Sequence, residues 1–398
     1  MTMETKDEIF KEHLNEWLNA EGNRTKRAMI AVNMVFATKC HPKSVSRTFK
    51  RIQLAEAKPE RRGRTPYYGK DVVAALRDIW DVGDHACGEV LHPMIAEYVE
   101  TLRRHKQWRH DDIATGKLFA MSETTVKRNV THFRKENGVR KHGLSGTSPS
   151  ALKNIIPIRK GPWKDTKPGD GQLDTVAHCG ESLAGSFIWT LDYTDIATYW
   201  TIISPQWNKG QEATKENVIA IRKRLPFPLT ALHPDSGGEF INWVLKDWCE
   251  QEHVFLSRSE PYKKNDNMCV EERNGHVIRR YVGWERLDAI ETLPLVSELC
   301  DKVNLYVNHW KAVKRMISKE RVGAKYRRVY EKRATTPYQR VVAREDISKE
   351  IKKKLREEHE LLNPLNLLRE IATLRKKIYE VTKSARERRT DDVISVTV

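Results

Sequence analysis

The sequence lacks the cysteine patterns and apolar runs that mark several protein classes. Its six cysteines are scattered, with no Cys-x-x-Cys pair and no partner histidine segment, which argues against a structural zinc site and against a disulfide framework. No stretch reaches the roughly 18 consecutive apolar residues of a membrane span, and residues 1–10 are acidic and polar. We therefore expect a soluble, cytoplasmic protein without a membrane partner.

Acidic side chains are outnumbered over the chain as a whole but not in its middle. Over 398 residues, 71 Lys and Arg face 54 Asp and Glu, and the net charge of +17 predicts a polyanionic partner such as nucleic acid. Residues 166–312 hold 16 basic and 21 acidic side chains, a net charge of −5, whereas residues 1–165 and 313–398 each carry +11. Basic arms suit phosphate binding, and an acidic middle suits metal binding.

Apolar residues near the amino terminus recur at helical spacing over 6–20, 28–36 and 44–54. A short turn at 41–43 precedes the last of these segments, which is the pattern of a helix-turn-helix whose second helix can enter the major groove. A solvated basic face on a bundle helix is the alternative. The basic residues predicted to contact DNA here are Lys43, Arg47, Lys50 and Arg51.

A second helical region follows the first. Apolar periods predict four helices, near 71–81, 91–105, 113–120 and 124–135. Ser122 can cap the last of them, which turns basic residues outward, and we predict that Lys127 and Arg128 contact DNA. Two basic helices that each follow a short turn favour DNA binding over a chance arrangement.

Two segments have no apolar period and are predicted to be linkers. Residues 58–69 are rich in proline and arginine, and this basic linker could lie in a minor groove through Arg61, Arg62 and Arg64. Residues 138–165 are rich in Gly, Ser, Pro and Lys and are expected to form an extended connection.

The pattern changes from helical to β-type at residue 171. Three consecutive β-type runs, followed by two more that helical segments separate, predict a mixed five-stranded α/β sheet with helices over 166–312. The expected strands are 172–177, 186–193, 198–204, 229–233 and 253–256, and the expected helices are 215–225 and 239–251.

Three acidic residues stand where this sheet would bind a ligand. Asp174 lies mid-strand, where an ionised side chain facing the core needs a compensating cation. Asp235 ends the fourth strand, at the carboxyl edge where open α/β sheets place ligands, and Glu271 opens a helix. There are 60 residues between Asp174 and Asp235, and 35 between Asp235 and Glu271.

These acids and their surroundings resemble a known family. The features shared with the catalytic core of DDE transposases and retroviral integrases are the strand order, the Asp-Ser-Gly-Gly-Glu-Phe turn at 235–240, Pro261-Tyr262, the 35-residue gap and Glu271-x-x-Asn274. The resemblance covers roughly residues 166–312 and implies an RNase H-like fold. Segments 258–275 and 75–88 look like bacterial insertion-sequence transposases with an integrase (rve) core. Unlike retroviral integrases, the chain has no amino-terminal zinc domain of His and Cys.

The resemblance implies metal-dependent DNA cleavage at transposon ends and transfer of the freed 3′-hydroxyl into target DNA. This chemistry uses two cations about 4 Å apart, and three carboxylates suffice for two Mg2+ ions, with Mn2+ able to substitute. Asp174 is expected to bridge the ions, and Asp235 and Glu271 to bind one each. Glu272 would take the place of Glu271 after a one-residue slip, but the Glu-x-x-Asn spacing favours Glu271.

Accessory residues are expected around the three acids. His178 could assist catalysis, although a histidine at a strand end is more often a structural hydrogen-bond donor. Glu239 is expected to cap its turn. Basic and amide residues after Glu271 could grip phosphates or form a solvated face, and those of the preceding loop could touch target DNA. These predicted contacts are Asn274, Arg279 and Arg280 on the helix and Lys263 and Lys264 in the loop.

The carboxyl-terminal arm combines β-type and helical patterns. Residues 313–343 alternate basic and apolar side chains, with a turn at 335–337, and are predicted to form a small basic β-rich module that lies on DNA phosphates. Residues 344–398 hold a charged helix over 348–360 and an apolar stripe within 361–381. We expect the stripe to form an intermolecular coiled coil, with folding back on its own domain as the alternative.

We predict a multidomain protein in which helix-turn-helix modules, an RNase H-like core and a basic tail act as a homo-oligomer on double-stranded DNA at a bacterial nucleoid. The expected divisions are 1–57, 58–69, 70–137, 138–165, 166–312, 313–343 and 344–398. Participation of a helper ATPase is left open. The alternatives are a nuclease of the same fold that does not join strands, and a DNA-binding regulator with an inactive core, which the presence of all three acids disfavours.

Overall fold

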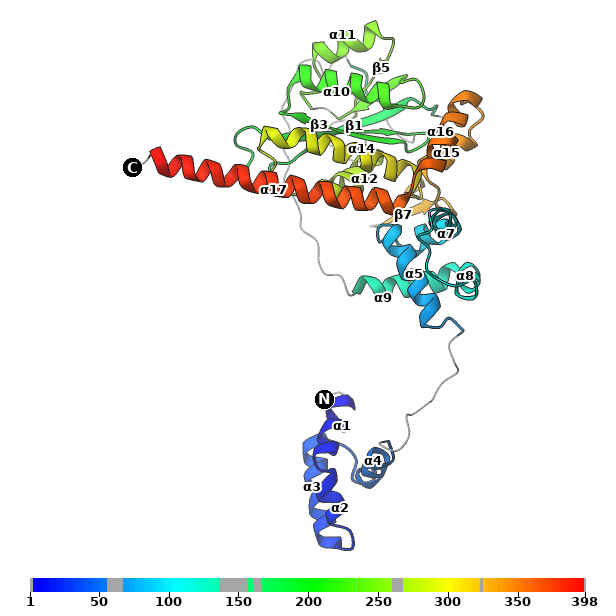
Figure 1. Ribbon diagram of the computed structural model, residues 1–398, viewed down its shortest axis with the longest axis vertical. Helices are drawn as coiled ribbons and strands as arrows, with labels where there is room; N and C mark the ends of the chain where they lie inside the picture. The colour runs from blue at the N-terminus through cyan, green and yellow to red at the C-terminus, as the bar shows by residue number, and fades with distance from the viewer. Residues whose placement is uncertain are drawn as a thin grey trace. The chain divides into compact units, whose positions relative to one another are not determined.

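The computed structural model describes residues 3–55, 67–135, 156–159, 166–235, 237–259, 268–322 and 325–396. The chain forms two compact units, Met1–Tyr67 and Tyr68–Val398. Figure 1 follows the chain from its blue amino terminus to its red carboxyl terminus. Five of the predicted DNA contacts lie outside the described residues, namely Arg61, Arg62, Arg64, Lys263 and Lys264.

The described part of the first unit packs four helices around an aromatic core. They are α1 (Met3–Glu12), α2 (Leu14–Asn19), α3 (Arg24–Thr38) and α4 (Pro42–Ala55). Phe10 and Phe49 meet edge to face with ring centroids 4.9 Å apart, and Trp17 stacks on Phe49 at 4.6 Å. The single helix predicted over 6–20 is wrong in one detail, because a turn at His13 divides it in two.

The second unit begins with the helical region that we predicted over 70–137. Its elements are α5 (Lys70–Val82), α6 (Gly88–Leu91), η1 (His92–Met94), α7 (Ile95–Arg104), α8 (Asp112–Phe119) and α9 (Glu123–Lys135). The helix expected over 91–105 is interrupted by the 3-10 turn η1, whose Pro93 lacks an amide hydrogen. Gly88 lets α6 approach α9, since a Cβ atom there would lie 2.6 Å from the Lys127 Cα.

A mixed five-stranded sheet lies at the centre of the second unit, as the sequence predicted. Its strands are β1 (Asp170–Ala177), β2 (Ile188–Asp195), β3 (Thr201–Trp207), β4 (Ala231–Pro234) and β5 (Phe255–Leu256). Their order is β3-β2-β1-β4-β5, in which β2 is antiparallel to β1 and β3, whereas β4 is parallel to β1 and β5. The carboxyl ends of β1 and β4 therefore meet at one edge of the sheet.

Helices cover both faces of this sheet (Figure 1). One face carries α10 (Gln211–Arg224) and α11 (Trp243–Gln251), which share a core with Leu173. The other face carries α12 (Met268–Arg273), the π-helical turn η3 (Asn274–Ile278), α13 (Arg279–Tyr281), the short turn η4 (Ile290–Thr292) and α14 (Leu293–His309). Val176 lies in the core on this second side. Because side chains alternate along a strand, Asp174 also faces this side.

The carboxyl-terminal arm contains the expected strands but differs at the expected turn. β6 (Met316–Val322) and β7 (Lys325–Tyr330) pair in antiparallel fashion. Residues 335–337 do not close a β-turn, because Thr336 caps α15 (Pro337–Ala343) and exchanges hydrogen bonds with Gln339 in a capping box. Two further helices follow, α16 (Lys349–Leu361) and α17 (Pro364–Val396).

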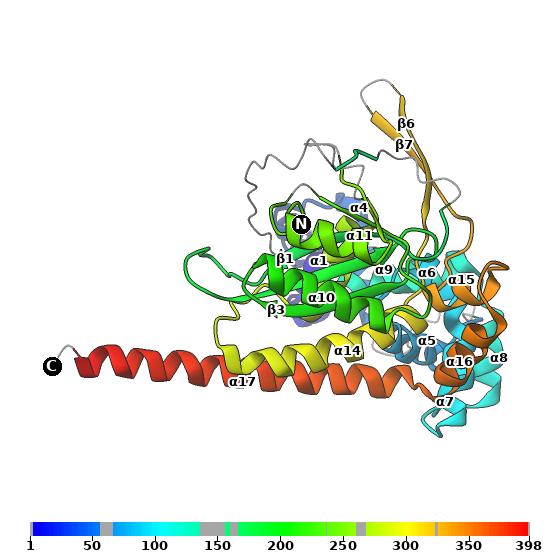
Figure 2. The ribbon, with the colours of Figure 1, turned by 90° about the horizontal axis from the view of Figure 1, so that it is seen from above.

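The apolar stripe of α17 folds back on its own unit, which corrects our expectation of an intermolecular coiled coil. Figure 2 shows α17 running beside α14. The stripe residues buried in the core of the unit are Leu367, Ile371, Leu374 and Ile378. Burial within one chain removes this apolar surface from water without a second protomer.

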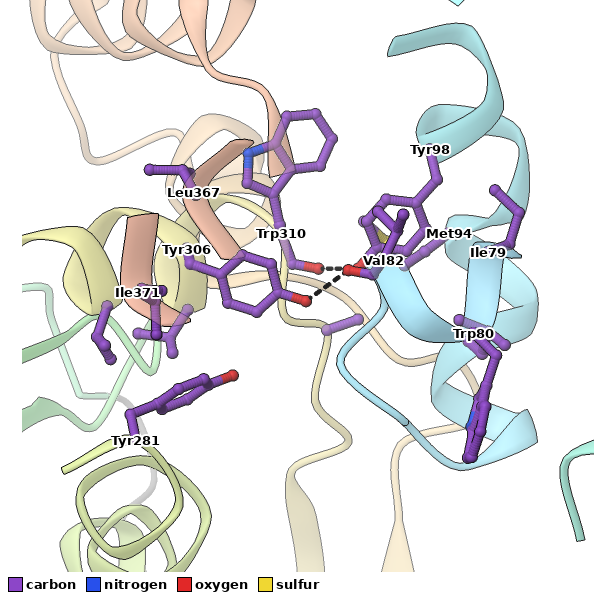
Figure 3. Close-up of a cluster of buried hydrophobic side chains, with 14 of the residues drawn as sticks. Ile79, Trp80, Val82, Met94, Tyr98, Tyr281, Tyr306, Trp310, Leu367 and Ile371 are labelled. Carbon is purple, nitrogen blue, oxygen red and sulfur yellow. Dashed lines mark hydrogen bonds between the residues drawn. The ribbon is translucent and has the colours of Figure 1, made fainter. Parts of the chain in front are cut away.

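The helical region and the sheet share this core (Figure 3). Tyr306 of α14 donates a hydrogen bond to the Val82 carbonyl oxygen at 2.8 Å, and Tyr98 of α7 donates one to the Trp310 carbonyl oxygen at 2.8 Å. One compact unit therefore spans the segments that we predicted as separate divisions after residue 67. The boundaries predicted inside this unit stay predictions.

Candidate active site

Asp174 lies near the middle of β1, partly buried beneath α12. Its Oδ2 accepts a hydrogen bond from Asn274 Nδ2 at 2.6 Å, and its Oδ1 accepts one from the Thr175 amide at 2.7 Å. Burial raises the pKa of Asp174 to about 7, and the nearby negative charge of Asp235 adds to this rise, while the two hydrogen bonds oppose it.

Asp235 reaches the same edge of the sheet because β4 runs parallel to β1. The register pairs Leu173 with Pro234, so Asp235, the first residue after β4, lies beside Asp174, which is still within β1. Asp235 Oδ1 accepts a hydrogen bond from the Gly237 amide at 2.9 Å, which fixes the turn after β4. The structure thus brings together the two aspartates that the sequence predicted.

Glu271 lies on the exposed side of α12, near the start of that helix. The helix is anchored to β1 by Gln172, whose Oε1 accepts hydrogen bonds from the amides of Cys269 at 2.9 Å and Val270 at 3.2 Å. Of the helical residues predicted here, it is Asn274 that contacts Asp174. The third predicted acid therefore belongs to a helix held against β1 but is exposed, whereas Asp174 is partly buried.

The two aspartates suit a divalent cation. Hard oxygen ligands are those that magnesium prefers, and a cation would relieve the repulsion that raises the pKa of Asp174. Among the described residues, no group of three His, Cys, Asp or Glu side chains is arranged to hold a metal ion. Asp174 and Asp235 therefore fit such an ion as a pair, and Glu271 is not gathered with them.

Two further carboxylates near Asp174 were missed as site residues by the sequence reasoning. Asp192 is directly opposite Asp174 across β1 and β2, is fully buried, and has its pKa raised to about 8 by burial. Glu239, expected only to cap its turn, accepts a hydrogen bond from Thr175 Oγ1 at 2.9 Å and pairs with Lys209 at 2.6 Å. The sequence contained a signal for Asp192, because side chains alternate along a strand and Asp192 therefore shares one face with Thr190 and Thr194.

His178 occupies a structural position just beyond β1. It is fully buried, and its Nε2 is 2.8 Å from Thr190 Oγ1. Burial, together with the positive charge of Arg279, lowers its pKa to about 3. A neutral, hydrogen-bonded ring fits the structural role that the sequence had left open beside a catalytic one.

The predicted DNA contacts of the helical regions lie on the surface. Lys43, Arg47 and Lys50 are exposed on α4. The remaining predicted contact of α4 is Arg51, which is exposed and forms an ion pair with Asp7. On α9, Lys127 pairs with Glu89, and Arg128 is exposed. These exposed positions are compatible with DNA contact, which stays a prediction.

The two arginines after Asn274 differ in their surroundings. Arg279 lies over the Trp284 ring, with its guanidinium carbon 4.5 Å from the ring centroid. Arg280 donates hydrogen bonds to both carboxylate oxygens of Asp84, in the loop after α5. Both arginines line a surface groove. The guanidinium of Arg280, which the sequence left open between gripping phosphates and a solvated face, forms this intramolecular pair, whereas that of Arg279 lies on an aromatic ring.

Similarity to known proteins was found with a solved structure and with a protein sequence. No family model matches the sequence. A solved structure, the HTLV-2 integrase catalytic core domain in complex with magnesium in its dimeric form, is 16% identical to this chain. The match covers 37% of this chain and 90% of the other with a TM-score of 0.28, a value too low to support a conclusion about fold or activity.

Among the described residues, none of the helices has the length and apolar character of a membrane span.

The relative found by sequence is the uncharacterized protein y4rM of Sinorhizobium fredii, which is 33% identical over 262 residues. The match covers 65% of this chain and 74% of y4rM. Identity at this level over most of the relative means that the chain belongs to the same family as y4rM.

Proposed function

We propose that this protein is a DDE-type DNA transposase or integrase with an RNase H-like core. It would cleave DNA at the ends of a mobile element and join the freed 3′-hydroxyl to target DNA. Such an enzyme would work as an oligomer on double-stranded DNA in the cytoplasm, at the nucleoid of a bacterial cell. The relative y4rM is uncharacterized, so the proposal depends on the site itself.

The observation that carries the proposal is the pairing of Asp174 on β1 with Asp235 after the parallel strand β4. A buried carboxylate whose pKa is raised beside a second carboxylate at a sheet edge is typical of a metal-assisted catalytic centre. The helix that starts near Glu271 is tied to the same strand through Gln172 and Asn274.

Each residue has a definite task in the proposed reaction. Asp174 and Asp235 would hold Mg2+, and the bound metal would activate the attacking oxygen and stabilise the leaving one. Glu271 keeps its assignment as the third ligand from the sequence, although the structure does not gather it with the two aspartates. Asn274 fixes Asp174 Oδ2, so that the carboxylate keeps one orientation. The Thr175 amide donates a hydrogen bond to Oδ1 of Asp174, and Thr175 Oγ1 donates one to Glu239, which also pairs with Lys209.

The proposal can be tested with the full chain and labelled DNA. Duplexes that carry the sequences flanking its gene, with and without a pre-exposed 3′-hydroxyl, are incubated with Mg2+ or Mn2+ and a target plasmid. We expect joined products from the wild-type protein and at least a 100-fold loss with Asp235→Asn, in line with removal of a charged catalytic group. Asp247→Asn, at an exposed position of α11, is the matched control and should keep full activity.

The outcomes separate the proposal from its alternatives. Cleaved DNA without joined product would point to a nuclease of the same fold and refute strand transfer. Sequence-specific DNA binding that Asp235→Asn leaves intact, with no cleavage by the wild-type protein in either metal, would point to a regulator with an inactive core.

A further inference from the structure

A groove of about 1170 Å³ lies beside the candidate active site, between the end of the α12 helix and α17. One wall is the segment 275–287, which continues directly from α12. The other wall is the stretch 372–386 of α17. The apolar stripe of α17 is buried against α14, and the face of α17 beside this stripe, together with Ile378 of the stripe itself, lines the groove.

The groove is strongly basic. Its walls include Arg279 from the first segment and Arg375, Lys376, Lys383 and Arg386 from α17, whereas Glu285 is its one acidic lining residue among those described. Lys376 and Lys383 pair with glutamates one turn along α17 at 3.7 Å, in exposed contacts that contribute little energy. A concave surface of this charge concentrates anions.

The groove adjoins the candidate active site along the chain. Gly275, which lines the groove, directly follows Asn274, whose side chain donates a hydrogen bond to Asp174. Trp284 and the exposed ring of Tyr379 also line it, and the Arg279 guanidinium lies over the Trp284 ring. Planar cations and aromatic rings in a positive groove are typical of surfaces that bind a nucleic-acid strand.

We propose that this groove binds the phosphate backbone of DNA and guides a strand to or from Asp174. The DNA-binding part of the proposal stands on the charge and shape of the groove alone. The statement that the bound strand leads to a reacting phosphodiester rests on the proposed function. The α17 helix, expected from sequence to join two protomers, thereby becomes part of the DNA-binding surface.

The test removes two groove charges and compares the loss with a matched pair outside the groove. Arg375→Gln with Lys376→Gln changes the groove wall, whereas Arg369→Gln with Lys377→Gln changes two exposed positions of α17 that do not line it. Both double variants lose the same charge from the same helix. Exposed substitutions of this kind should leave the melting temperature almost unchanged, which provides the check on folding.

Binding is measured by fluorescence anisotropy of a labelled 30-mer, as a duplex and as a single strand, at several salt concentrations and without divalent metal. The plot of log K against log salt concentration has a negative slope. Loss of two phosphate contacts should make this slope shallower by about 1.8 for a duplex, or by about 1.4 for a single strand. At 0.1 M salt this corresponds to about 60-fold weaker duplex binding. The control variant should differ from wild type by less than about twofold.

Equal effects of the two double variants, or no change of slope in either, would overturn the groove proposal. Strand-transfer assays on the same proteins separate this result from the proposed function. If the wild-type protein joins no DNA but only the groove variant loses binding, the groove assignment holds and the proposed reaction fails. If the groove variant loses binding but joins DNA normally, the reaction stands and the proposal that the groove guides the reacting strand is overturned.

Discussion

Replacing Asp84 with asparagine should weaken the packing of the helical region 70–135 against the rest of the second unit. Asp84 receives hydrogen bonds from Arg280 and Tyr281, and Lys311 Nζ lies 3.2 Å from its Oδ2. Its φ of 51° falls in the left-handed region, which asparagine also tolerates. The variant Asp84→Asn therefore removes the negative charge without adding backbone strain.

The expected loss follows from the burial of the group. The side chains of Asp84 and Lys311 are each 14% exposed, and that of Arg280 is 28% exposed. Removing one partner of a buried ion pair costs about 3–5 kcal/mol, because the opposite charge is left uncompensated. Asparagine keeps an acceptor for Arg280, so we expect a loss of about 3 kcal/mol. Asp78→Asn, which breaks an exposed contact to His110, should cost at most about 1 kcal/mol.

Hydrogen-deuterium exchange measures this loss locally. A decrease of about 3 kcal/mol in the free energy of opening should speed amide exchange in α5 by roughly 100-fold, while α10, on the other side of the sheet, keeps its protection. Adding Lys311→Met to Asp84→Asn should restore part of the protection, because it removes one of the two facing cations. The same exchange rates in Asp84→Asn and Asp78→Asn would refute the reasoning.

The loss should also depend on pH. Burial lowers the pKa of Lys311 to about 8, against the opposing attraction of Asp84. A lysine whose folded pKa lies below its unfolded value destabilises the fold while it is protonated, and this penalty is relieved as the pH rises above the folded pKa. Without the charge of Asp84 the folded pKa of Lys311 falls further, so the penalty for protonated Lys311 starts to decrease below pH 8. The difference in melting temperature between Asp84→Asn and wild type should therefore be smaller at pH 9 than at pH 7.

Two further predictions concern packing and charge elsewhere in the second unit. Gly88→Ala should destabilise the unit by about 1–3 kcal/mol, because its Cβ atom would overlap the backbone of α9. Gly116→Ala, with open space around its Cβ atom, should instead stabilise α8 by about 0.5–1 kcal/mol. Chemical denaturation measures both changes in the free energy of unfolding. Burial raises the pKa of Glu331, but hydrogen bonds from Arg340 and Arg315 outweigh this effect and lower the pKa to about 2. The melting-temperature gap between wild type and Glu331→Gln should thus narrow as the pH falls from about 5 to 2, while Glu345→Gln, at an exposed site, should show no such trend.

Hydrophobic periodicity predicted most of the elements of this fold, because each buries one face. The five strands and the helices α10, α11 and α12 were expected in the order in which they occur, whereas α14 was not among the expected elements. The differences arise where one residue overrides the period. Pro93 breaks a helix through its missing amide hydrogen, and Thr336 starts one through its capping box. The sequence could not show which surface buries the apolar stripe of α17, since an apolar face at helical spacing can pack on a partner chain as well as on α14.

The candidate site was predictable in the part that a parallel strand pair determines. Asp174 and Asp235 each follow from a position along a strand, and the register of β1 and β4 then brings them together. The contacts of Glu271 could not be read in the same way, because they depend on how α12 is held by Gln172. Asp192 was missed because its neighbour across the sheet is known only once β1 and β2 are paired.

The distribution of charge along the chain acquires a different meaning in the folded protein. In the sequence, the basic segment 313–398 appears as an arm that carries DNA to an acidic middle. In the structure, α17 of that segment lies against α14, and its Arg375 and Lys376 face Arg279 across the groove. A basic wall built onto the acidic core needs no separate movement to bring DNA to Asp174. The salt dependence of DNA binding should therefore arise partly inside the second unit, and Arg375 and Lys376 are where that contribution is measured.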